Sequence, residues 1–228
     1  MALYVAELWR YPVKSLAGER VSMATLLPDG MSGDRIVRVR GPEGVRTSRR
    51  HYRLLGLRGT LDAHGHARID GHPWDSADAL ARVRDAAGAD AWLEKWGGLD
   101  RFDVLPLLIA TDGAVAAFGR DVRRLRPNIV VGGVDGLAER EWLEAELHIG
   151  DDAIIRLDSL RSRCVMTTID PDTLRVNHDV MRDIVRRFDN KLAVNAEVVR
   201  GGLIHVGDPV ALVHPGPLTL SESQCIVG

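Results

Sequence analysis

Polar and apolar residues alternate along several short segments in the first third of the chain. Residues 3–13 and 20–30 follow this period of two, and the second segment ends in the turn sequence Pro28-Asp29-Gly30. A period of two places successive side chains on opposite faces of a strand. Turn residues at 41–44 and at Asp70-Gly71 predict two further hairpins. The first third is therefore predicted to consist mainly of short strands.

One segment departs from this period. Leu80, Val83 and Ala87 recur at helical spacing, and Ser76 stands where a helix N-cap is expected. We predict a helix within residues 76–98, with a break at Gly88.

The remaining sequence predicts more short strands and few helices. The expected elements are buried strands within 102–113 and 123–136, two strands joined near 158–160, a short helix over 179–188, and two strands around Gly201-Gly202 with a bend at 207–209. Residues 214–228 are weakly patterned and are expected to fray. Many short strands with few helices indicate a closed or nearly closed β architecture, because open sheet edges favour aggregation.

Composition restricts the function. The chain has 228 residues, enough for one large or two small domains, and its net charge of -2 argues against general nucleic-acid binding. No segment approaches the roughly 20 apolar residues of a membrane span. The two cysteines are about sixty positions apart and give no disulfide framework, and the N-terminus offers no secretion signal. A cytoplasmic location is therefore expected.

Cationic residues are concentrated in a few places. Residues 45–61 contain five arginines and no carboxylate, which fits either a solvated face or an anion site. Lys14 and Ser15, after the rigid Pro12, could bind phosphate at a strand end. The other candidates for an anion site are Arg35, Thr47, Ser48 and Arg49.

The sequence Arg126-Pro127-Asn128 combines a guanidinium with an amide that both donates and accepts hydrogen bonds. This pair suits a polar heterocycle, and a turn capped by Asn128 fits the same residues equally well.

Cys164 lies between two arginines and two threonines. It can be a buried small side chain, a nucleophile or a metal ligand. No histidine stands in a recognisable catalytic context, whereas Arg161 and Arg163 would favour a thiolate, the form that binds soft metals. Composition does not choose among these three interpretations of Cys164.

Six short motifs, taken together, resemble the MOSC domain family. They are YPVKS (11–15), SGDR (32–35), RTSR (46–49), RPNIVV (126–131), SRCVMTTIDPDT (162–173) and VGDPV (206–210). Their order and spacing match that family over residues 3–213. Leu174 differs from many relatives, which have glycine after the DPDT sequence.

The resemblance implies a mainly β fold with helices (α+β). A smaller N-terminal α/β subdomain over 1–100 would pack on a MOSC β-barrel over 101–214, followed by a C-terminal tail over 215–228. A molybdenum cofactor, Mo-molybdopterin, would lie in the cleft between the two.

The resemblance also implies roles for individual residues. Lys14, Ser15 and Arg35 would hold the phosphate end of the cofactor, beside a basic wall formed by Thr47, Ser48 and Arg49. Arg126 and Asn128 would contact the pterin. Ser162, Arg163 and Cys164 would lie at the metal, with the Cys164 thiolate as its protein ligand. Asp112 would lie on the substrate side and pass protons.

The activity implied is removal of oxygen from N-hydroxylated small molecules. Only Cys225 follows the barrel segment, so we expect no iron–sulfur cluster in this chain and a separate electron donor of ferredoxin, flavin reductase or cytochrome type. Two alternatives stay open: a carrier of sulfur or of the molybdenum cofactor that uses Cys164, and a binding module without cofactor.

Overall fold

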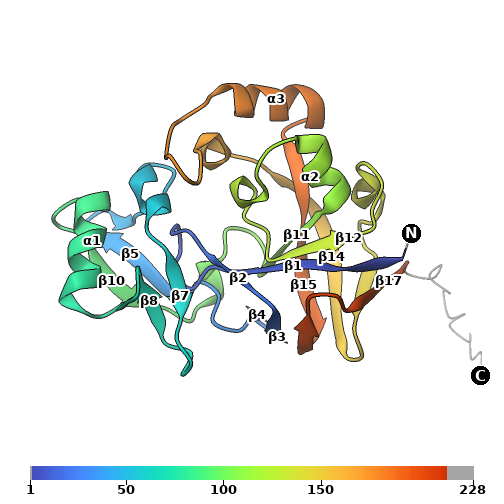
Figure 1. Ribbon diagram of the computed structural model, residues 1–228, viewed down its shortest axis with the longest axis horizontal. Coiled ribbons are helices and arrows are strands. Elements are labelled where there is room, and N and C mark those ends of the chain that lie inside the picture. The colour runs from blue at the N-terminus through green and yellow to red at the C-terminus, as the bar shows by residue number, and fades with distance from the viewer. Residues whose placement is uncertain (1, 215–228) are drawn as a thin grey trace, which may run out of the picture.

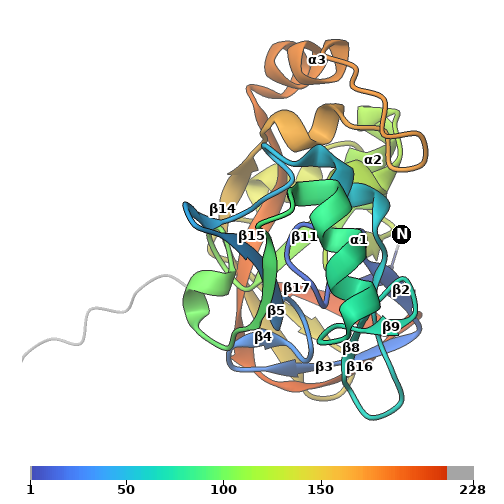
Figure 2. The same ribbon diagram turned by 90° about the vertical axis from the view of Figure 1, so that its left-hand side faces the viewer.

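The computed structural model describes residues 2–214, which form two lobes side by side. Figure 1 shows a lobe of small sheets and one helix next to a β-barrel, and Figure 2 views the same molecule from the side of the smaller lobe.

Seven strands close into the barrel. Each pairs with its two neighbours, and β1 closes the ring by pairing with both β12 and β17. The order around the ring is β1 (Leu3–Arg10), β12 (Ile129–Gly132), β11 (Leu107–Thr111), β15 (Lys191–Arg200), β14 (Ala153–Ser162), β13 (Glu146–Ile149) and β17 (Pro209–Val213). A closed ring has no unpaired strand edges, in agreement with the closed or nearly closed β architecture that the sequence predicts.

Side chains from all seven ring strands fill the barrel. In β15, Val194 and Ala196 point into this core, while Leu192 and Ala193 pack outside it. Helices α2 (Asp112–Phe118) and α3 (Asp179–Phe188) supply part of that outer cover. Both faces of β15 are therefore covered, which explains the unbroken run of buried residues 192–196, apolar except for Asn195.

Four smaller strands lie outside the closed ring. Strand β2 (Glu19–Val21) pairs with β1, and β16 (Gly202–His205) pairs with β3 (Met23–Leu27), which pairs with β4 (Gly30–Met31). Strand β3 alternates exposed and buried residues as its sequence predicts.

The smaller lobe has a core of its own. It contains the sheet β10 (Trp92–Lys95), β5 (Val37–Gly41) and β6 (Gly44–Val45), the sheet β7 (Gly59–Leu61), β8 (Ala67–Ile69) and β9 (His72–Pro73), and helix α1 (Ala77–Ala87). Val37, Val39, Ile69 and Val83 are fully buried where these elements meet.

Helix α1 begins as predicted, because the Ser76 hydroxyl accepts a hydrogen bond from the Ala79 amide. It ends at Gly88, whose φ of 112° is a backbone conformation that glycine adopts readily and other residues rarely adopt. The part of the prediction beyond Gly88 is wrong: residues 92–95 form strand β10, which pairs with β5.

A second correction concerns residues 158–160, where a turn was expected. Strand β14 runs through them, and the turn lies at residues 150–152, where Gly150 has a φ of 58°. The polar pair Asp158-Ser159 falls at a shift in the register with β15, so it marks a bulge and not a chain reversal.

The expected fold class, a mainly β protein with helices and a β-barrel, is confirmed. Strand β1 belongs to the barrel ring although it lies within 1–100, because its amides and carbonyls pair with β12 and β17. Helix α3 matches its predicted bounds. The expected tail over 215–228 lies outside the described residues. Among residues 2–214, no helix is both long and apolar enough to cross a membrane.

Helix α2 was not predicted, and a glycine fixes its position. A Cβ at Gly113 would lie 2.4 Å from the Val134 carbonyl oxygen and 2.5 Å from that of Gly136. Only glycine therefore allows α2 to pack this closely on the turn after β12.

We predict that Gly113→Ala lowers the free energy of unfolding by about 1–3 kcal/mol, the usual cost of overpacking. Urea unfolding followed by circular dichroism measures it. Gly97→Ala is the matched control, because no atom lies within 4 Å of its added Cβ. Equal stabilities of the two variants would contradict the close packing at Gly113.

Candidate functional site

A cleft of about 380 Å³ opens between the lobes, and both contribute to its walls. The smaller lobe and the strand leading into it supply Lys14, Ser15, Arg35, Thr47 and Arg49. The barrel side supplies Asp103, the segments 124–126 and 159–164, Met166 and Asn195. A volume of this size suits a small-molecule ligand or cofactor.

Lys14 and Ser15 reach the cleft because the chain leaves the barrel at the end of β1. The Lys14 amide donates to the Val37 carbonyl, which ties this segment to the smaller lobe. Ser15 is buried and has a φ of 74°, a conformation rare outside glycine. The Lys14 ammonium donates to the Arg101 carbonyl at 2.7 Å.

Arg35 is fixed by a buried carboxylate beside it. Asp34 is fully buried, accepts a hydrogen bond from the Tyr11 amide at 2.7 Å and pairs with the Arg35 guanidinium. The guanidinium also lies 5.5 Å from the centre of the Tyr11 ring. These contacts hold Arg35 at the wall of the cleft, where φ of 53° turns the chain.

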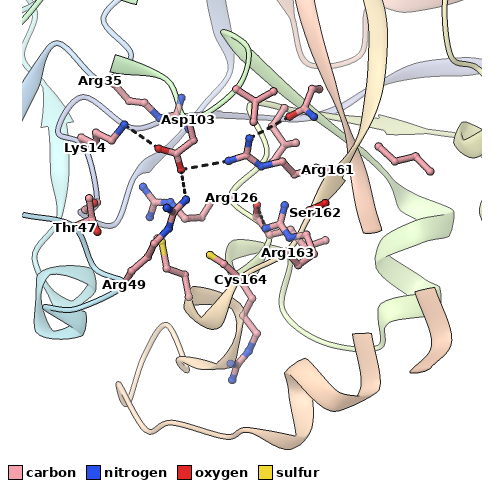
Figure 3. Close-up of a pocket in the computed structure, with 18 of the residues that line it drawn as sticks. Lys14, Arg35, Thr47, Arg49, Asp103, Arg126, Arg161, Ser162, Arg163 and Cys164 are labelled. Atoms are coloured by element: carbon pink, nitrogen blue, oxygen red, sulfur yellow. Dashed lines mark hydrogen bonds and ion pairs between the residues drawn. The ribbon is translucent and has the colours of Figure 1, made fainter. Parts of the chain in front are cut away.

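Asp103 is the centre of the charge arrangement. Its carboxylate lies 3.0 Å from the Lys14 ammonium, 2.9 Å from Arg49 and 3.3 Å from Arg161, as the dashed lines in Figure 3 show. Burial alone would raise the pKa of this carboxyl, but the three cations hold it below its ordinary value. Asp103 is thus charged at neutral pH.

The end of β14 presents the candidate metal ligand. Arg161 donates to the Asn195 side chain, and the Arg163 amide donates to the Asn190 carbonyl, so this segment stays anchored to β15 as it leaves the sheet. Cys164 follows, half-buried and lining the cleft. It is the only free cysteine within residues 2–214.

The two threonines after Cys164 shape the turn that presents it. Thr167 donates through its hydroxyl to the Cys164 carbonyl at 2.9 Å, and the Thr168 hydroxyl donates to the Val165 carbonyl at 2.6 Å. Both threonines are buried, so their role in the motif is to hold the short 3-10 helix Val165–Thr168.

Two arginines at the cleft lack a carboxylate partner within the described residues. Arg126 lies 4.2 Å from the centre of the Tyr11 ring, and Arg163 donates to the Leu125 carbonyl at 2.7 Å. Burial lowers the pKa of both guanidinium groups. The Arg163 Nε atom is buried without a hydrogen-bond partner. Seven cationic side chains line the cleft, against the single lining carboxylate of Asp103 among residues 2–214.

Three of the candidate residues do not line this cleft. Ser48 is fully buried and contacts the Met166 sulfur at 3.5 Å. Asn128 is also fully buried; its amide oxygen accepts from the Leu108 amide and its nitrogen donates to Asp34. The Asp112 carboxylate accepts hydrogen bonds from the backbone amides of Gly113, Gly133 and Val134.

These contacts give Ser48, Asn128 and Asp112 supporting positions. Asp112 in particular accepts its hydrogen bonds at the start of α2 and does not line the cleft. The acidic residue in the cleft is Asp103, which sequence reasoning missed together with Arg124 and Met166. Arg161 stood beside a recognised motif, whereas nothing around Asp103 in the sequence signals its three partners.

Family models match almost the whole chain. The MOSC N-terminal beta barrel domain matches residues 2–119, and the MOSC domain matches residues 112–211. The chain belongs to the MOSC family. The resemblance in the six motifs is thereby confirmed.

Two relatives align with about half of the length of this MOSC chain. Human mitochondrial amidoxime-reducing component 1 is 31% identical over 130 residues, which cover 49% of this chain and 38% of that protein. Mitochondrial amidoxime reducing component 2 of Macaca fascicularis is 30% identical over 127 residues, which cover 47% and 37%. The match thus spans less than two fifths of those relatives.

A solved structure supports the fold. The YUAD protein of Bacillus subtilis aligns with a TM-score of 0.52 and 12% identity, covering 95% of this chain and 98% of that one. At this identity the likeness concerns the fold alone.

We predict that Asp103→Asn raises the affinity of the cleft for inorganic pyrophosphate about tenfold, because it removes the anion that already engages Lys14, Arg49 and Arg161. Calorimetric titration of the chain free of cofactor measures this. Asp85→Asn removes one charge from a remote ion pair with Arg53 and is the matched control. Weaker binding by Asp103→Asn would show that Asp103 organises the cations and does not compete with the ligand.

Proposed function

We propose that this protein is a molybdenum-cofactor-dependent oxidoreductase that removes oxygen from N-hydroxylated compounds such as amidoximes. The observation that carries this proposal is Cys164, a half-buried thiol at the base of an arginine-lined cleft. Membership of the MOSC family and relatives named amidoxime-reducing components support it.

The cleft fits an anionic cofactor on three grounds. Its cations outnumber its carboxylates, Arg163 Nε is buried without an acceptor, and Arg126 has no carboxylate partner within residues 2–214. A metal bound by protein alone would need several ligands, and no group of three histidine, cysteine or carboxylate side chains suited to a metal occurs among the described residues. One thiolate suffices when the metal is held mainly by an organic ligand.

The lining residues divide the work of binding. Lys14, Ser15, Arg35, Thr47 and Arg49 would receive the phosphate end, since all five line the cleft and the four labelled in Figure 3 lie on the same side of it. Arg126 would lie along the pterin, and Ser162 and Arg163 would flank the metal that Cys164 binds. Ser48 and Asn128 would support these residues from behind.

The cofactor, when bound, supplies the two-electron reduction. An amidoxime takes up two electrons and two protons, its N–O bond breaks, and an amidine and one water leave. A separate ferredoxin, flavin reductase or cytochrome type protein would deliver the electrons.

The chain's own residues bind, orient and balance charge. Asp103 is poorly suited to donate protons near neutral pH, because the ion pairs with Lys14, Arg49 and Arg161 keep its pKa low. The protons would therefore come from solvent through the open side of the cleft. Asp103 would instead limit how strongly the cations attract anions.

A carrier of sulfur or cofactor is the second candidate, because Cys164 is partly accessible and lines the same cleft as Arg161 and Arg163. A carrier would hold one extra sulfur atom on Cys164 or release the cofactor, without turnover. Turnover of an N-hydroxylated substrate and the mass of Cys164 separate the two functions.

We predict that the protein, produced in a host that makes the cofactor, reduces benzamidoxime to benzamidine with reduced methyl viologen as electron donor. Cys164→Ser lowers kcat by about a hundredfold or more, because a serine oxygen is a poor substitute for a thiolate on a soft metal. Chromatography of benzamidine gives the rate.

Cys225→Ser is the matched control, the same substitution at the other cysteine, and it keeps full activity. No turnover by the unaltered protein loaded with cofactor, together with a gain of one sulfur on Cys164 by mass spectrometry, would replace the enzyme proposal with the carrier.

A further inference from the structure

A second recess of about 340 Å³ adjoins the Cys164 cleft. The two share Arg124, Arg126 and Met166, while none of the other residues expected to hold the cofactor lines the second one. Its remaining walls come from both lobes and from the segment after Cys164, which supplies Ile169 and Pro171.

Rigid apolar surfaces form the interior of this recess. The Trp9 ring is fixed because its Nε1 donates to Glu7 at 2.7 Å, and the buried Tyr11 donates its hydroxyl to the Pro127 carbonyl. A Cβ at Gly18 would lie 2.4 Å from the Tyr11 ring, so only glycine allows the chain to pack this closely on Tyr11. Flat surfaces of this kind suit a planar ring.

The charge of the recess has one sign. Five arginines and no carboxylate line it among residues 2–214. Two of the five are engaged by carboxylates at 2.6–2.8 Å: Arg123 binds Asp121 and Asp172, and Arg124 binds Asp170.

The other arginines have donors to spare. The Arg58 guanidinium has no hydrogen-bond or ion-pair partner within residues 2–214, although its backbone amide donates to Asp70. Arg20 lies 3.6 Å from Glu7, and its side chain is 58% exposed. Arg126 stacks on Tyr11. A carboxylate matches the donor pattern of a guanidinium group such as that of Arg58, and Arg20 has only the long contact with Glu7.

We propose that this recess binds the aromatic carboxylate end of a substrate whose N-hydroxylated group reaches the Cys164 cleft. This inference rests on the proposed function. The ring would lie against Trp9 and Ile169, and the carboxylate would meet Arg20 and Arg58. The preferred substrates are then N-hydroxylated amidines that carry an aromatic acid.

The kinetic test compares 4-carboxybenzamidoxime with benzamidoxime, using the cofactor-loaded protein and reduced methyl viologen. The KM of the carboxylated substrate is expected to be about tenfold lower. The double variant Arg20→Gln with Arg58→Gln removes this difference and leaves kcat for benzamidoxime unchanged. Arg186→Gln, an exposed arginine on α3, is the control that keeps the difference. Equal KM values for the two substrates in the unaltered protein would overturn the inference.

A binding test stands apart from turnover. Calorimetry on the chain without cofactor is expected to show that 4-carbamoylbenzoate binds, that neutral benzamide does not, and that the double variant loses this binding. If neither amidoxime is reduced but this pattern holds, the proposed function fails and the recess is still an aromatic carboxylate site. Binding that survives in the double variant, or no preference for the carboxylate, would overturn the assignment to Arg20 and Arg58.

Discussion

An excess of positive charge in one cleft is the constraint around which this molecule is arranged. Seven cationic side chains line the cleft, and the carboxylate of Asp103 is shared by three of them. Guanidinium groups such as that of Arg163 are costly to bury without acceptors. An anionic ligand with several acceptor oxygens would remove that cost, so the cleft has the character of a binding site even without the ligand.

The buried polar contacts behind the cleft explain how its walls stay in place. Asp34 is fully buried and receives the Tyr11 amide, the Asn128 amide and the Arg35 guanidinium. It thereby joins strand β1, the start of β12 and the chain entering the smaller lobe. Removing one member of such a network would leave its buried partners unsatisfied. Asn128 is thus tied to the shape of the cleft through Asp34.

Much of the fold follows from local pattern. The alternation in β3, the Ser76 cap and Gly88 end of α1, and the length of α3 were readable because neighbouring residues decide them. Two errors share a cause: the segment 158–160 looked like a turn and residues 92–95 looked helical, but pairing with β15 and β5 overrides these local signals. Closure of the ring by β1 depends on contacts more than a hundred residues apart, which periodicity does not encode.

The candidate site was predictable as a set of motifs and less so in its detail. Lys14, Arg35, Arg126 and Cys164 do line one cleft. Asp103 was missed because its partners come from positions 14, 49 and 161, and nothing near it in the sequence announces them. Asp112 does not line the cleft, and its carboxylate accepts hydrogen bonds from three backbone amides, a setting that the sequence does not reveal. A carboxylate's role depends on what surrounds it in space.

The central claim, that the cleft holds a metal-pterin group, is tested most directly by the molybdenum and pterin content of the protein purified from a cofactor-producing host. Elemental analysis and fluorescence of the oxidised pterin give both quantities per chain. The account predicts close to one of each. A well-folded chain that contains neither, and takes up neither when incubated with the free cofactor, would contradict it.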